Sequence, residues 1–216
     1  MRILVIGSGG REHALTWKLR QSPHADRIFC APGNAGMGEI AENIAIPATD
    51  LKTLVRFAKE NRIDLTVVGP DDPLAAGIVD LFTSEKLRAF GPDKSAARIE
   101  SSKIFAKELM RTQKIPTAEA GTFSKSGDAV RHCERLRFPI VIKADGLALG
   151  KGVVIAADAE TARSTIDDMM NQARFGDAGR RIIIEEFLYG TECSLHALVD
   201  GKDYLLLESA RDRKRA

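Results

Sequence analysis

Short apolar runs that alternate with amphipathic helices constrain the fold of this chain more than any other feature. Runs typical of buried strands occur at residues 3–6, 27–31, 65–69 and 87–91. Apolar residues at helical spacing follow or separate them, at Leu51, Leu54, Val55 and Ala58 and again at Leu74, Ile78, Leu81 and Phe82. Strands that alternate with helices favour a parallel sheet covered on both faces. The sequence therefore predicts an open α/β domain over residues 1–120, with its last helix around 102–110.

The pattern changes after Ile115-Pro116-Thr117, because proline favours an extended path. The apolar runs 139–143 and 153–156 are joined by a short glycine-rich turn, which predicts an antiparallel hairpin. A helix around 159–169 and a third strand at 181–186 follow, and Asp200-Gly201 suits the two-residue turn of another hairpin. We expect a second unit in two parts, 121–188 and 189–216. The sequence stops directly after a strand, so we expect the last part to be incomplete.

Composition and charge exclude several classes of function. The 216 residues can bury a core without disulfides or a structural metal. With 32 basic and 30 acidic residues the net charge is +2, which argues against a nucleic-acid partner. No apolar stretch approaches the length of a membrane span. Cys30, Cys133 and Cys193 match no disulfide or metal spacing, so we expect buried thiols in a cytoplasmic protein.

The first glycine cluster, residues 7–10, lies between a predicted strand and a predicted helix. Exposed amides at a helix N-terminus bind anions, so the cluster predicts a phosphate site. A dinucleotide-binding turn is disfavoured, because Glu12 takes the third glycine position and no acid ends the second strand. Residues 33–36 and 69–73 form two further turns at strand ends, where ligands of open α/β sheets bind. One small phosphorylated molecule at these turns is favoured, and a set of purely structural turns stays open.

The glycine-rich segment 143–152 carries the strongest signal of the second unit. The segment has three glycines within seven residues, 146–152, and two lysines, Lys143 and Lys151, and such a loop suits a polyphosphate. It is not a P-loop, because Gly152 stands where a metal-binding Ser or Thr would be needed. Downstream, an apolar strand leads into Glu185 and Glu186, which predicts a slot for adenine. A plain hairpin turn and solvated glutamates at a strand end are the alternatives.

Taken together, these motifs resemble one enzyme family. Residues 7–15, 32–36, 69–74, 143–152, 175–179 and 185–188 occur in an order and form similar to the phosphoribosylamine–glycine ligase family. The resemblance covers the whole chain but only the front part of that family's length. It implies an α/β fold, with an open parallel-sheet N-terminal domain followed by part of an ATP-grasp fold. It also implies ATP-dependent ligation of glycine to 5-phosphoribosylamine in purine synthesis, through a glycyl phosphate intermediate, with ADP and phosphate released.

The resemblance also assigns roles to residues. It implies that Lys143 is catalytic and that ATP is bound by Lys103, Lys143, Gly146, Gly150, Lys151, Gly152, Glu185, Glu186, Leu188 and Glu192. Lys103 and Lys143 would contact the phosphates, residues 146–152 would form a mobile loop over them, and Glu192 would contact the ribose. Phosphoribosylamine would be held by Gly9, Gly10, Arg11, Asn34 and Asp71.

The cofactor and partner expectations follow from the same resemblance. Mg²⁺ (or Mn²⁺) is expected to accompany ATP. The ligands of the metal ion and the glycine site are expected beyond residue 216. The protein is expected to be a monomer. Arg213 departs from the family's pattern, which has histidine at that position. Two other functions remain: an inactive nucleotide-binding fragment of such a ligase, and the disfavoured dinucleotide oxidoreductase.

Overall fold

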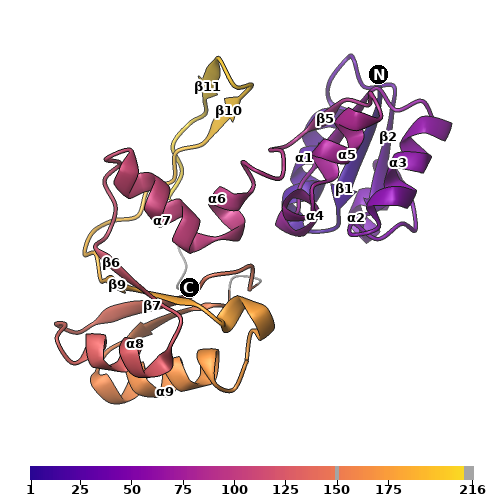
Figure 1. The fold of residues 1–216 in the computed structure, drawn as a ribbon. Coiled ribbons are helices and arrows are strands. Elements are labelled where there is room, and N and C mark those ends of the chain that lie inside the picture. Colours follow the sequence, from indigo (N-terminus) through magenta and orange to yellow (C-terminus); the bar gives the residue numbers. More distant parts are fainter. Residues whose placement is uncertain (149–150, 212–216) are drawn as a thin grey trace.

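The N-terminal unit is a parallel sheet with helices around it (Figure 1). The computed structural model describes residues 1–148 and 151–211. The strands of this sheet have the order β3-β2-β1-β4-β5, and all neighbouring pairs are parallel, as predicted. They are β1 (Arg2–Gly7), β2 (Arg27–Pro32), β3 (Glu42–Asn43), β4 (Leu65–Val68) and β5 (Ala89–Phe90). The helices are α1 (Gly10–Arg20), α2 (Ala35–Gly38), α3 (Leu51–Glu60), α4 (Asp71–Ala76) and α5 (Ile78–Ser84).

Side chains of β1 alternate between two apolar clusters, one on each face of the sheet. Leu4 and Ile6 belong to the cluster that includes Leu54 and Phe82, whereas Val5 belongs to the cluster around Met37. Successive residues of a strand point to opposite faces. A strand buried on both faces therefore needs an unbroken apolar run, and that run is what the sequence shows.

Two details of this unit differ from the prediction. The apolar stripe 74–82 was expected to be one helix, but α4 and α5 are separate helices joined at Gly77. Gly77 has φ +94°, a left-handed conformation that glycine adopts without steric cost, so the chain changes direction there. The sequence also missed β3, because Glu42–Asn43 is a two-residue polar edge strand without an apolar signal.

The second unit contains an antiparallel sheet with strand order β6-β9-β7-β8. The strands are β6 (Ala120–Phe123), β7 (Ile140–Ala144), β8 (Val153–Ala156) and β9 (Ile182–Glu186). Helices α8 (Ser126–Cys133) and α9 (Ala159–Met170) cover one face, and a 3₁₀ helix spans Gly176–Gly179 (Figure 1). The predicted hairpin of β7 and β8 is confirmed. The strand β6 was not predicted, because its four residues include Gly121 and show no apolar run.

A second hairpin projects away from both sheets (Figure 1). It consists of β10 (Ala197–Val199) and β11 (Tyr204–Leu206), which are antiparallel. The predicted two-residue turn is wrong, because Val199 pairs with Tyr204 and four residues connect them. The Asp200 carboxylate accepts hydrogen bonds from the amides of Lys202 and Asp203, and these bonds stabilise the longer loop.

Helices α6 (Arg98–Ser101) and α7 (Lys103–Thr112) lie between the two units (Figure 1). Because hydrogen bonds tie the start of α7 to the segment after β7, this helix packs on the second sheet. The domain ranges 1–120, 121–188 and 189–216 stay predictions.

The three cysteines differ in their exposure to solvent. Cys30 and Cys133 are buried as expected, but Cys193 is exposed, which corrects that expectation.

In the part of the chain that the structure describes, no helix combines the length and apolar character that crossing a membrane requires.

Candidate active site

Three turns meet at the carboxyl edge of the parallel sheet, one each after β1, β2 and β4. The Asn34 side-chain amide donates to the carbonyl of Ser8 at 2.9 Å. The amide of Gly33 donates to the Gly7 carbonyl at 3.1 Å, and that of Gly69 donates to the Ile6 carbonyl at 3.1 Å. The residues expected to hold phosphoribosylamine therefore lie on neighbouring turns; they are Gly9, Gly10, Arg11, Asn34 and Asp71.

Glu12 is buried beneath these turns, and the sequence had assigned it no role beyond excluding a dinucleotide. Its carboxylate accepts a hydrogen bond from the Gly9 amide at 2.7 Å. A Cβ atom on Gly7 would lie 2.5 Å from Glu12 Cγ, and one on Gly69 would lie 2.6 Å from Glu12 Cδ. Glycines at these positions therefore leave the space that the Glu12 side chain fills.

Arg11 and Asp71 line a cavity of about 570 Å³. The guanidinium of Arg11 is 4.0 Å from Asp71 Oδ1, and both side chains are exposed to solvent. From the second unit, the segment after β7 contributes Leu147, Ala148, Gly152 and Val153, and Lys103 of α7 completes the wall. Residues expected for the two substrates thus share one cavity.

Strand alternation places Lys143 and Glu185 on the same face of the second sheet. In β7 and β9, Ile142 and Ile184 pack into the cluster beneath α8 and α9. Lys143 and Glu185 each follow one of these residues, so they point to the opposite face, toward α7. The register pairs Lys143 with Ile183, two residues before Glu185, which puts the two side chains in diagonal contact.

Glu185 is buried between two lysines. Lys143 Nζ lies 2.6 Å from Glu185 Oε2, and Lys107 Nζ lies 3.1 Å from Oε1. A buried carboxylate is tolerated only when it is paired, and here each oxygen has its own ammonium group. Lys107 was not among the residues expected at the site. Its position four residues after Lys103, on the same face of the predicted helix, could have indicated that both lysines face one site.

The second cavity, of about 550 Å³, lies between α7 and this face of the sheet. It is lined in part by Lys103, Lys107, Lys143, Glu185 and Leu188. Lys103 Nζ donates to the carbonyl of Gly146 at 3.1 Å. Burial lowers the pKa of Lys103, an effect that the nearby carboxylates of Glu100 and Asp145 oppose. Four of the residues expected to bind ATP therefore meet here.

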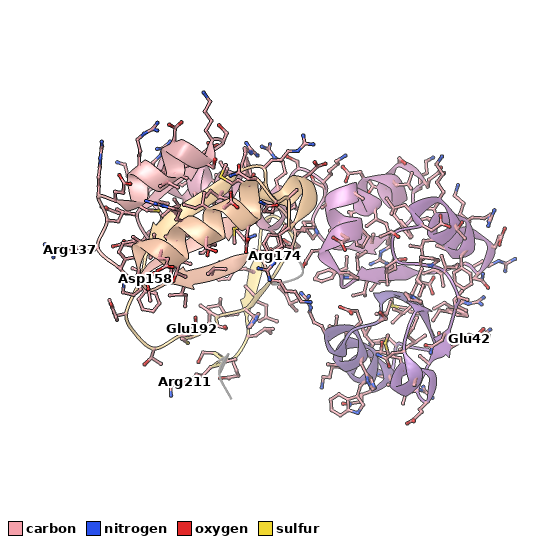
Figure 2. All side chains as sticks on the ribbon, turned by 90° about the horizontal axis from the view of Figure 1, so that it is seen from below. Glu42, Arg137, Asp158, Arg174, Glu192 and Arg211 are labelled. Carbon is pink, nitrogen blue, oxygen red and sulfur yellow. The ribbon has the colours of Figure 1, made fainter. Side chains whose placement is uncertain are left out.

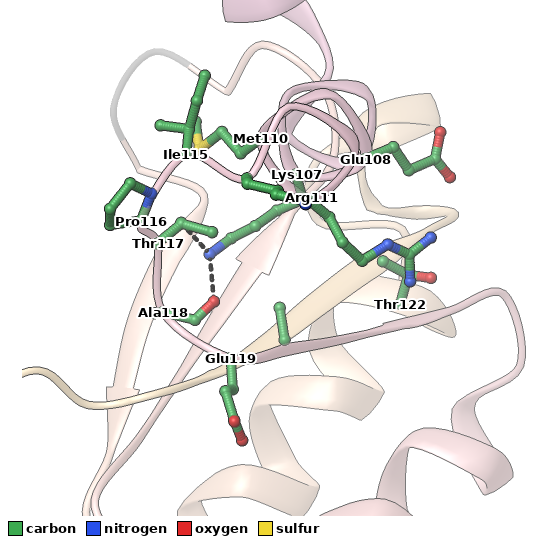
Figure 3. Close-up of a pocket in the computed structure, with 12 residues that line it drawn as sticks. Lys107, Glu108, Met110, Arg111, Ile115, Pro116, Thr117, Ala118, Glu119 and Thr122 are labelled. Carbon is green, nitrogen blue, oxygen red and sulfur yellow. Dashed lines mark hydrogen bonds between the residues drawn. The ribbon is translucent and has the colours of Figure 1, made fainter.

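Lys107 also lines a third cavity, of about 590 Å³, with residues of α7 and of the segment 114–120 (Figure 3). Lys107 Nζ donates to Thr117 Oγ1 and to the Ala118 carbonyl, both at 2.7 Å. The Thr117 hydroxyl, the Ala118 carbonyl and Glu185 Oε1 provide one acceptor for each N–H of the ammonium group. These three contacts hold the Lys107 side chain in one orientation.

Other expected ATP residues lie outside the second cavity. The Glu186 carboxylate accepts from the Glu119 amide at 2.9 Å and so joins β6 to β9. Glu192 is exposed on the segment after β9 and is not among the residues that line this cavity (Figure 2). Lys151 is exposed, and Gly150 lies outside the described residues. The roles given to these residues stay predictions.

Gly146 and Gly152 pack closely against neighbouring residues. A Cβ atom on Gly146 would lie 2.9 Å from the Cα of Ala178, and one on Gly152 would lie 2.7 Å from the Cβ of Ala148. Both positions therefore need glycine for close packing.

Comparison with protein families accounts for the full length of the chain. Residues 1–100 match the model described as "Phosphoribosylglycinamide synthetase, N domain". Residues 101–216 match "Phosphoribosylglycinamide synthetase, ATP-grasp (A) domain". The chain belongs to the phosphoribosylglycinamide synthetase family. The expected α/β fold with part of an ATP-grasp fold is thereby confirmed.

Relatives within the phosphoribosylglycinamide synthetase family are identical to this chain at about half of the aligned positions. It is 53% identical over 216 residues to phosphoribosylamine–glycine ligase of Halalkalibacterium halodurans, covering 100% of this chain and 50% of that protein. It is 48% identical over 217 residues to the Escherichia coli ligase, covering 100% and 51%. The chain thus spans about half the length of the curated relatives it matches.

Solved structures agree with this placement in the phosphoribosylglycinamide synthetase family. The crystal structure of phosphoribosylamine–glycine ligase from Thermotoga maritima aligns with a TM-score of 0.79 at 32% identity, covering 100% of this chain and 51% of that one. A biotin carboxylase domain from Hydrogenobacter thermophilus aligns with a TM-score of 0.76 at 16% identity, covering 96% and 49%. That likeness shows the fold alone; the domain was crystallised with the magnesium salt of ADP.

Within 1–148 and 151–211, no group of three or more His, Cys, Asp or Glu residues is placed to hold a metal ion.

Proposed function

We propose that this chain forms the phosphoribosylamine side and part of the ATP side of a ligase. The ligase joins glycine to 5-phosphoribosylamine and converts ATP to ADP and phosphate. Family membership supports this proposal, and one observation carries it: Lys103 lines both the cavity with Lys143 and Glu185 and the cavity with Arg11 and Asp71. The residues proposed for the two substrates are thus connected through one lysine.

The chemistry requires activation of a carboxylate. Glycine's carboxylate is a poor electrophile, so ATP first phosphorylates it to glycyl phosphate. The amine of phosphoribosylamine then attacks the carbonyl carbon, and inorganic phosphate leaves. Phosphoryl transfer of this kind depends on positioning and on neutralising charge. Lys103 and Lys143 supply positive charge beside the proposed path of the phosphates.

The ion pairs of Glu185 are compatible with this role. An ammonium group that contacts phosphate must share its hydrogen bonds with Glu185 or leave it. Lys107 holds the other oxygen of Glu185, so a shift of Lys143 toward phosphate leaves the buried carboxylate with one partner. Lys143 is therefore the proposed catalytic lysine, and Lys107 is the lysine that stays with the protein.

The phosphoribosylamine site would use the turns of the first sheet. The amides of Gly10 and Arg11 open α1, where a helix favours phosphate. The amide of Gly9 donates to Glu12 and would have to leave that carboxylate to join them. Asn34, Asp71 and Arg11 would contact the remaining polar groups. Mg²⁺ or Mn²⁺ accompanies ATP in this proposal, and we propose a cytoplasmic monomer.

The test is release of ADP by the product of the complete gene. We expect ADP to appear only when glycine and phosphoribosylamine are both present, with one glycinamide ribonucleotide formed for each ADP. ADP release that needs only one of them contradicts the substrate assignment. ATP binding without turnover identifies instead a nucleotide-binding fragment.

Substitution of Lys143 tests the proposed phosphate contact. Lys143→Ala should lower kcat/KM for ATP about 100-fold or more, the usual loss when one charge-stabilising donor is removed. Lys52→Ala, at an exposed position of α3, should leave kcat/KM unchanged. Near-normal activity of the Lys143 variant shows that the phosphate assignment is wrong.

A further inference from the structure

Asp145 is a buried carboxylate with no role in the proposal so far. It follows the end of β7, two residues after Lys143, and is 6% exposed. Its Oδ1 accepts from the Ser102 hydroxyl at 3.0 Å and from the Ile104 amide at 2.9 Å. Its Oδ2 accepts from the Arg181 guanidinium at 2.6 Å. Three donors therefore compensate the burial of this charge.

The backbone of Asp145 connects the same elements. Its carbonyl accepts from the Lys103 amide at 3.1 Å, and its amide donates to the Arg181 carbonyl at 3.0 Å. One residue thus links the first turn of α7, the start of the glycine-rich loop and the residue before β9. A carboxylate that accepts amide hydrogen bonds at a helix N-terminus stabilises the first turn.

The two proposed phosphate lysines lie on either side of this junction. Lys103 is the first residue of α7, and its ammonium donates to the carbonyl of Gly146, the residue after Asp145. Lys143 lies two residues before Asp145, at the end of β7. If the first turn of α7 separated from the loop, Lys103 would leave the cavity wall while Lys143 stayed with Glu185.

We propose that Asp145 is a positioning residue, which holds the start of α7 on the glycine-rich loop so that Lys103 and Lys143 face the same polyphosphate. The identity of the anion rests on the proposed function. The placement of the Lys103 and Lys143 ammonium groups does not depend on that function, because it follows from contacts within the chain itself.

The first measurement reads the position of Lys103 without any ligand. NMR of ¹³C-labelled lysine in the 216-residue chain gives the pKa of its ammonium group. In Asp145→Ala we expect this pKa to rise toward the ordinary lysine value, because burial is the main cause that lowers it and a released helix start exposes the group. Loss of the Asp145 charge without movement of the helix would instead lower the pKa of Lys103. Burial and the charge of Lys143 both lower this pKa, and only Glu100 would remain to raise it. The sign of the shift therefore separates positioning from simple electrostatics.

Two variants serve as rescue and control. Asp145→Asn keeps an acceptor for the Ile104 amide, so Lys103 should stay buried, with a pKa at or below that of the unmodified chain. Asp158→Ala removes an exposed carboxylate that caps another helix, α9, by accepting from the Thr161 amide at 2.8 Å, and it should leave the pKa of Lys103 unchanged.

The second measurement is titration with tripolyphosphate. Asp145→Ala should weaken binding about fivefold, the order of effect of losing a helix-start contact, and Asp158→Ala should not. An Asp145→Ala variant whose Lys103 pKa is unchanged or lower overturns the proposal. If that pKa rises but the product of the complete gene binds neither tripolyphosphate nor ATP, the positioning stands and the proposed function fails.

A milder change keeps the test valid if Asp145→Ala does not fold. Ser102→Ala removes one donor to Asp145 and the cap on the Phe105 amide. The pKa of Lys103 should rise by a smaller amount, and the absence of any rise overturns the proposal.

Discussion

Single residues in the first sheet are constrained by the space that Glu12 occupies. A Cβ atom on Gly69 would lie 2.6 Å from Glu12 Cδ, whereas one on Gly10 would meet no atom within 4 Å. Gly69→Ala should therefore lower the free energy of unfolding by about 1–3 kcal/mol, the usual cost of overpacking. Gly10→Ala, the same substitution two residues before Glu12, should raise it by about 0.4–1 kcal/mol. Urea denaturation measures both changes, and equal effects would contradict this explanation.

At the scale of elements, Glu185 joins β9 to β7 and to α7 through two buried ion pairs. Glu185→Gln leaves two ammonium groups facing each other without a countercharge. We expect it to lower the free energy of unfolding by about 3–5 kcal/mol, the usual cost of breaking a buried pair. Glu85→Gln removes the partner of Lys59 from an exposed pair and should cost less than about 1 kcal/mol. Similar losses in the two variants would show that burial of Glu185 has no energetic consequence.

At the scale of the whole molecule, the described residues form separate apolar cores. The buried members of the clusters on the first sheet lie between Ile3 and Ala97, and those of the second lie between Ala129 and Ile184. Units without a shared core lose protection independently. Hydrogen exchange at increasing urea should therefore show two transitions. Gly69→Ala should shift only the transition of β1, β2 and β4, and Glu185→Gln only that of β7 and β9. One cooperative transition, shifted by either variant, would show that the units unfold together.

Local patterns in the sequence were enough to predict most of the fold. The roles of the site residues stay predictions, although Lys103, Lys143 and Glu185 do line one cavity. Apolar runs and turn lengths predict the parallel strands of the first sheet and the antiparallel pair β7 and β8, because side-chain periodicity and loop length depend only on neighbouring residues. The same reasoning failed at Gly77 and at β3. There the deciding factors are a left-handed backbone and an edge position, which leave no apolar signal.

Only the tertiary structure shows how the charged side chains pair. Ser102 and Asp145 are 43 positions apart, and Lys107 and Glu185 lie on different elements, so no spacing in the sequence connects them. Their contacts depend on α7 packing against the face of the second sheet opposite α8 and α9. The sequence by itself determined most of the strands, helices and glycine turns, because local sterics and burial select them. The fold decided that Lys107 and Lys143 both meet Glu185, because a buried charge must find its partner wherever packing places one.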